Sequence, residues 1–98
     1  MRQIEEMMIQ AVTNKQNFKC SNTEVKTING AVFVALHGNL IFANIDGKKY
    51  FSNSGWNTRT TASRLRALGA DYSTNYKKCH CELTSRQEMK NLLYSVMG

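Results

Sequence analysis

Residues 23–53 read TEVKTINGAVFVALHGNLIFANIDGKKYFSN, and they decide the fold because turn signals divide them at regular intervals. Asn29-Gly30 is a strong hairpin signal, since a type I′ turn needs a positive φ angle at both of its central residues. Gly38-Asn39 and Asp46-Gly47 reverse the chain again. The segment therefore predicts a four-stranded antiparallel meander whose strands cover 23–28, 31–37, 40–45 and 48–52.

The predicted strands differ in polarity. Residues 31–36 (AVFVAL) and 40–45 (LIFANI) are largely apolar at both odd and even positions. Strands of this kind are inner strands that are covered on more than one side. The last strand carries Lys48 and Lys49, whose charges discourage edge-to-edge pairing with another sheet.

Amphipathic helices flank the meander. An apolar stripe with the spacing i, i+3, i+4, i+7, i+8 begins at Ile4 and predicts an N-terminal helix. The same stripe begins again at Met89, and Ser85 with Glu88 forms a capping-box pattern just before it. A C-terminal helix is therefore expected as well.

A central helix is expected to begin near Thr58–Thr61 and to end at Gly69, because threonine is a good N-cap and glycine a common C′ residue. A fifth strand is predicted around 75–83. The resulting order is α-β-β-β-β-α-β-α. This is an α+β fold, an antiparallel four- to five-stranded meander sheet packed with N-terminal, central and C-terminal helices.

The composition bounds the class of protein. We expect the 98 residues to form one domain, 1–98, and the hydrophobic fraction of 42% is typical of a folded globule. No apolar run has the length of a membrane span, and Glu5 and Glu6 lie where a signal peptide would need its apolar stretch. Three cysteines without an export signal favour reduced thiols. We therefore expect a cytosolic protein.

The net charge of +6 is concentrated in one region. Acidic and basic residues cancel over 1–47 and again over 79–98. The excess lies in 48–78, where Asp71 alone opposes the cations Lys48, Lys49, Arg59, Arg64, Arg66, Lys77 and Lys78. Charge localised in this way predicts association with phosphate backbones, an anionic membrane or an acidic protein surface.

The predicted anion-binding surface combines these cations with the start of the central helix. Arginine suits bidentate phosphate contacts and lysine acts as a point charge, while Thr58 and Thr60 accompany the exposed N–H groups of a helix N-terminus. The structural alternative is that the threonines cap the helix and that the charges form an ordinary solvated face. Trp56 would stack on bases if exposed, but a lone tryptophan beside glycine favours a core position.

The three arginines of the central helix are expected to differ. At 100° per residue Arg59 and Arg66 face away from the apolar stripe, whereas Arg64 lies at its border. Arg64 is therefore a candidate for a partly buried arginine with a defined partner.

Metal binding and catalysis are weighed against simpler interpretations. Cys79-His80-Cys81 lacks the C-x₂₋₄-C spacing of structural zinc sites, and on a strand the histidine points away from the cysteines. His37 lies at a predicted turn, where it is as easily a hydrogen-bonding turn residue as a base. No paired-carboxylate motif or phosphate-binding glycine loop is present. We expect no metal, no cofactor and no enzymatic activity.

Three motifs resemble a family of small, uncharacterised proteins of tailed bacteriophages. The family pattern is N-T-x-V, then L-H-G-N-x-I, then G-W-x-T-x-T-T-x-S-R-L, after an N-terminal helix and an aromatic residue. Here the motifs begin at Asn22, Leu36 and Gly55, and Phe18 is the aromatic residue. The resemblance covers roughly residues 1–70. It implies a phage origin and action in the cytoplasm of the infected bacterial host, and it transfers no enzymatic activity.

Two classes of partner follow from these observations. The leading hypothesis is a non-enzymatic phage accessory protein that binds DNA or RNA through the basic face in 48–78. The first alternative is an inhibitor or antidefence protein that docks on a bacterial host protein. Another is a protein that binds a small nucleotide through Arg64 and the threonines. A homodimer is compatible with an exposed edge strand, and no membrane partner is expected.

Overall fold

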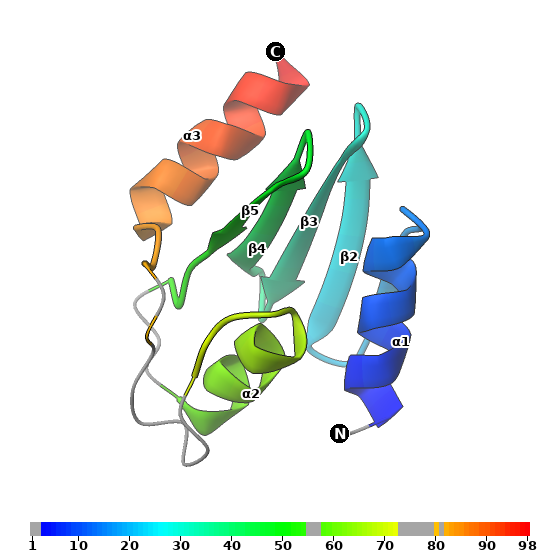
Figure 1. Ribbon diagram of the computed structural model, residues 1–98. Helices are drawn as coiled ribbons and strands as arrows, with labels where there is room; N and C mark the ends of the chain where they lie inside the picture. Colours follow the sequence, from blue (N-terminus) through cyan, green and yellow to red (C-terminus); the bar gives the residue numbers. More distant parts are fainter. Residues whose placement is uncertain (1–2, 55–57, 73–79, 81) are drawn as a thin grey trace.

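The computed structural model describes residues 3–54, 58–72, 80 and 82–98, and its elements form an α+β fold (Figure 1). In chain order these are α1 (Gln3–Thr13), β1 (Phe18–Cys20), β2 (Thr23–Ile28), β3 (Ala31–Leu36), β4 (Asn39–Ile45), β5 (Lys48–Phe51), α2 (Arg59–Ala67) and α3 (Arg86–Met97). The strands form one antiparallel sheet in the order β1-β2-β3-β4-β5. The predicted meander with N-terminal, central and C-terminal helices is confirmed. No helix within the described ranges is long and apolar enough to cross a membrane.

The three hairpin turns between β2 and β5 each have two successive residues with positive φ, as a type I′ turn requires. The pairs are Asn29-Gly30 and Asp46-Gly47, as predicted, and His37-Gly38. The middle turn was predicted one residue too late, because Asn39 already belongs to β4. Histidine at φ 52° takes the place that asparagine or aspartate has in the other two turns.

One strand of the sheet was not expected from the sequence. β1 pairs with β2 from Phe18↔Val25 to Cys20↔Thr23, and no strand was predicted at residues 18–20. A segment of three residues is too short to show the alternation of apolar and polar side chains that identifies a strand. Most of the fifth strand predicted at 75–83 lies outside the described residues, and His80, Glu82 and Leu83 are not in a strand.

Helices cover both faces of the sheet, which gives three layers. On one face α1 and α2 enclose a core that includes Met8, Val34 and Leu65. On the other face α3 contributes Met89 to a smaller core with Phe33 and its neighbours. Since side chains alternate along a strand, the consecutive residues of AVFVAL supply both cores in turn. This accounts for the apolar character of β3 at every position.

A β-bulge in β4 shifts the alternation of side chains. Val34 pairs with Phe42 but Ala35 pairs with Leu40, so Ile41 is an extra residue in the ladder. Ile41 and Phe42 are both 1% exposed and both belong to the core under α1 and α2. Leu40 consequently packs with the α3 core on the opposite face. The bulge thus places Leu40 instead of Ile41 on the α3 face, together with Ala43 and Ile45.

Candidate functional site

Arg64 lies in the interior of the protein and not on the predicted basic surface. Arg64 is 3% exposed, and its Nη1 atom donates to Oε2 of Glu5 at 2.8 Å. Its Nε atom donates to the hydroxyl of Thr23 at 3.2 Å, and Ser63 donates to the same Glu5 oxygen at 2.6 Å. Arg64 has the defined partner that was expected, but it is fully buried and not partly buried. The prediction that Arg64 belongs to the anion-binding surface is wrong, because its guanidinium is buried and already bound to the Glu5 carboxylate.

The two predicted threonines lie at the start of α2. Thr58 is the N-cap residue, and its hydroxyl accepts from the backbone N–H of Thr61 at 3.2 Å. Thr60 lines a small cavity of about 170 Å³ together with His37, Asn39 and other residues at the same end of the sheet. His37 Nε2 lies 3.3 Å from the side-chain amide of Asn22, so the histidine links two turns. Capping accounts for Thr58, and none of the described residues that line the cavity is Asp, Glu, Lys or Arg.

The remaining predicted cations do not form one surface. Lys48 and Lys49 follow the β4–β5 turn, whereas α2 lies at the opposite end of the sheet, beside the β3–β4 turn (Figure 1). Both lysines line a cleft of about 410 Å³ whose other side carries Glu82 and Glu88, so its formal charges cancel. Arg59 and Arg66 are exposed on α2.

The other predicted residues lie outside the described part of the chain. These are the cations Lys77 and Lys78, and also Trp56, Cys79 and Cys81. Among the described residues, no group of three His, Cys, Asp or Glu side chains is placed to hold a metal ion.

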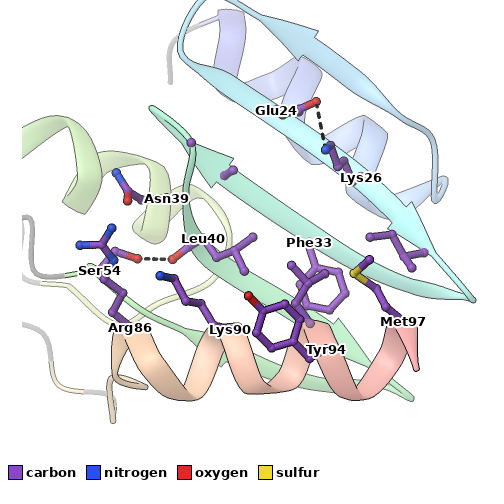
Figure 2. Close-up of a pocket in the computed structure, with 14 residues that line it drawn as sticks. Glu24, Lys26, Phe33, Asn39, Leu40, Ser54, Arg86, Lys90, Tyr94 and Met97 are labelled. Carbon is purple, nitrogen blue, oxygen red and sulfur yellow. Dashed lines mark hydrogen bonds and ion pairs between the residues drawn. The ribbon is translucent and has the colours of Figure 1, made fainter.

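An open groove of about 600 Å³ separates α3 from the part of the sheet formed by β2, β3 and the start of β4 (Figure 2). Helix α3 packs on the sheet through Met89 and its apolar neighbours; Ile28 of β2 packs against this core, whereas Glu24 and Lys26 of β2 line the groove. The groove is lined by Glu24, Lys26, Ile28, Phe33, Ala35, Gly38, Asn39, Leu40, Ser54, Arg86, Lys90, Leu93, Tyr94 and Met97.

The α3 wall of the groove changes from basic to apolar along its length. Arg86, Lys90, Tyr94 and Met97 follow one another at helical spacing, and Figure 2 shows all four side chains on the same side of α3, beside the sheet. Tyr94 is 63% exposed and Met97 59%, whereas the Phe33 side chain on the sheet is buried. The α3 wall therefore offers positive charge at one end and apolar and aromatic surface at the other, while Lys26 lies on β2 beside Phe33.

One hydrogen bond caps the start of α3, and another ties its last turn to the sheet. Ser85 caps its N-terminus by accepting from the backbone N–H of Glu88 at 3.2 Å. Near the other end, the side-chain amide of Asn29 in the β2–β3 turn donates to the carbonyl of Val96 at 2.8 Å. The wall is thus tied to the sheet independently of its apolar contacts.

The groove carries more positive than negative charge. Lys26, Arg86 and Lys90 line it against Glu24 alone, which leaves a formal excess of two positive charges. Glu24 lies 3.9 Å from Lys26, and because both side chains are partly exposed this pair contributes little. Within the part of the chain that the structure describes, Arg86 and Lys90 have no ion-pair partner.

Sequence reasoning missed this groove because charges were summed along the chain. Over 79–98 the sum is zero, yet Arg86 and Lys90 face the groove while Glu82 and Glu88 face the cleft at β5. The signal that could have found it is the spacing of Arg86, Lys90 and Tyr94, which places all three on one helical face.

Comparison with known proteins places the chain in a family. The family model described as Kyanoviridae Gp96 protein matches residues 1–90, which include α1, the whole sheet, α2 and the start of α3. The match extends beyond the roughly 70 residues over which we noted a resemblance to phage proteins. No curated protein and no solved structure matches the chain. The chain belongs to the Kyanoviridae Gp96 protein family and is a bacteriophage protein.

Proposed function

We propose that this phage protein is a non-enzymatic accessory protein that binds nucleic acid in the groove between α3 and the sheet, in the cytoplasm of the infected host. The observation that carries the proposal is the meeting of Lys26, Arg86 and Lys90 in one open groove with the exposed ring of Tyr94. A positively charged groove with an aromatic side chain is the common form of a site for nucleic acid strands. The proposed surface thus differs from the 48–78 region.

The direction of α3 supports phosphate binding at the Arg86 end. A helix carries partial positive charge at its N-terminus and partial negative charge at its C-terminus. Arg86 is the first residue of α3 and Lys90 follows one turn later, so both side chains add to the favourable end of the dipole. Two cations about 5–6 Å apart at Cβ suit a polyanion, which presents its phosphates in series.

Fluorescence anisotropy with a labelled oligonucleotide at low salt tests the proposal. The wild-type protein is expected to bind, and Arg86→Gln with Lys90→Gln is expected to weaken binding strongly. The matched control is Arg59→Gln with Arg66→Gln, which removes the same charge from α2 and is expected to change the affinity little. A larger loss in the α2 variant would move the site back to 48–78, and no binding by the wild-type protein to DNA or RNA would refute the proposal.

Docking on a bacterial host protein is the second candidate function. Its support is the adjacent exposure of Tyr94 and Met97 on α3, since exposed aromatic and methionine side chains are enriched in protein interfaces. Of the other methionines in the terminal helices, Met8 and Met89 are fully buried, whereas Met7 is 42% exposed. Pull-down from bacterial lysate with and without nuclease separates the two functions. A bacterial protein that is still captured after nuclease treatment, and is no longer captured by the Tyr94→Ala variant, favours docking.

A further inference from the structure

We infer that the groove accepts an unpaired base, so that the nucleic acid it selects is single-stranded; this inference rests on the proposed function. The α3 side of the groove is basic at one end and apolar at the other. A nucleotide likewise combines an anionic phosphate with an apolar base. Arg86 and Lys90 lie at the basic end. Tyr94 and Met97, above the buried Phe33, form the apolar end, where a base would lie, and Lys26 borders this end from β2 as the strand partner of Phe33.

The shape of the groove favours a single base over a duplex. Its volume of about 600 Å³ lies within the usual range of about 300–1,000 Å³ for small-molecule pockets. Its walls are α3 on one side and β2 on the other, and β3 with the start of β4 forms its floor (Figure 2). A duplex keeps its bases stacked inside and presents phosphates at its surface, so it could reach the cations but not the apolar floor. An unpaired base can enter.

The floor of the groove provides room for a ring. Phe33 and Ala35 are two residues apart on β3 and therefore face the same side. Phe33 is 2% exposed and Ala35 is only half-buried, so the sheet surface passes from a large aromatic side chain to a single methyl group. Tyr94 faces this region from α3 (Figure 2). A base placed here would contact the tyrosine ring, and every base has a π-face for that contact.

Glu24 limits where phosphates can lie. Its carboxylate lines the groove from β2, opposite the α3 wall, and lies 3.9 Å from Lys26. A second phosphate directed toward β2 would meet this negative charge. The carboxylate also accepts hydrogen bonds, as acidic side chains do from exocyclic amino groups of bases. Phosphates are therefore expected along α3, with the base directed toward the sheet.

Competition anisotropy with three probes of equal length tests the inference. The probes are a single strand, the same strand with abasic sites in place of its bases, and the duplex. The single strand is expected to bind about 5- to 150-fold more tightly than the abasic strand, the range expected for stacking one base. Tyr94→Ala is expected to abolish this difference and Tyr94→Phe to retain it. Because Tyr94 is mostly exposed, neither change disturbs the core.

The outcomes separate the inference from the proposed function. If the abasic strand or the duplex binds as tightly as the single strand, the groove recognises phosphates alone and the inference is wrong while the proposed function stands. If Tyr94→Ala keeps the full preference for the single strand, the base lies elsewhere and the inference is also wrong. If none of the probes binds the wild-type protein, both are refuted.

Discussion

The carboxylate of Glu5 and the guanidinium of Arg64 lie 2.8 Å apart, and both side chains are 4% exposed. The pair joins α1 to α2 across 59 positions of the sequence, and Thr23 of β2 and Ser63 of α2 each add a hydrogen bond to it. Buried ion pairs of this kind resist the removal of either partner alone, because the remaining charge has no access to water. The packing of both helices on the sheet therefore depends on the pair being complete.

Removing only the charge of Glu5 is expected to destabilise the protein strongly. Glu5→Gln leaves the buried Arg64 guanidinium without its counter-charge, which costs about 3–5 kcal/mol. Urea denaturation followed by circular dichroism measures the loss. Glu5→Met combined with Arg64→Met is expected to be closer to the wild type than Glu5→Gln, since no buried charge remains. Glu6→Gln, at an exposed position of the same helix, is the control, and an equal effect there would contradict the account.

The cap of α3 is expected to support the groove. Ser85→Ala removes the acceptor for the backbone N–H of Glu88 and is expected to cost about 1 kcal/mol. Hydrogen exchange should then become faster in the first turn of α3, and oligonucleotide affinity should fall because Arg86 lies in that turn. Ser95→Ala is the matched control, as Ser95 is exposed within the same helix. Unchanged exchange at the first turn would show that the cap does not hold the wall in place.

The turn residue Asn29 is expected to have two separable roles. Its φ of 50° forms the β2–β3 turn, and its side-chain amide holds the carbonyl of Val96 near the end of α3. Asn29→Gly keeps the turn and removes only the link to α3, whereas Asn29→Ala also imposes backbone strain. Thermal denaturation is expected to place Asn29→Ala below Asn29→Gly in stability. Equal stabilities would mean that the positive φ contributes nothing.

The salt dependence of binding is expected to report the groove cations. For single strands the slope of log K against log salt is about −0.7 per phosphate contact, so Arg86→Gln with Lys90→Gln should reduce its magnitude by about 1.4. Lys48→Gln with Lys49→Gln should leave the slope unchanged, because these lysines face Glu82 and Glu88 at the edge of β5. The reverse pattern would place the phosphates at β5.

Local signals in the sequence were sufficient for the fold class. The dipeptides at 29–30 and 46–47 have the turn conformation that their chemistry predicts, and α2 and α3 begin at the expected capping residues Thr58 and Ser85. β1 could not be predicted, because a three-residue edge strand is held by its pairing with β2 and has no pattern of its own. The bulge at Ile41 was equally hidden, since LIF reads as continuous apolar sequence whether or not the ladder shifts.

Less of the candidate site than of the fold could be predicted from the sequence. Helical geometry correctly placed Arg64 at the border of the core, but the sequence does not show that Glu5, 59 positions away, is its partner. Counting that arginine among surface charges overstated the basic region. The groove depends on α3 covering only part of a sheet face, which is a tertiary relationship. Helical periodicity applied to charge as well as to hydrophobicity would have separated Arg86 and Lys90 from Glu88.

The proposed binding of nucleic acid between α3 and the sheet can be tested directly by an NMR titration. Amide chemical shifts of ¹⁵N-labelled protein are recorded while an unlabelled single-stranded oligonucleotide is added at low salt. We expect the largest changes at Lys26, Phe33 and the α3 residues Arg86, Lys90 and Tyr94, with small changes in α2. Changes concentrated in α2 or at Lys48 and Lys49, with α3 unaffected, would contradict the proposed binding.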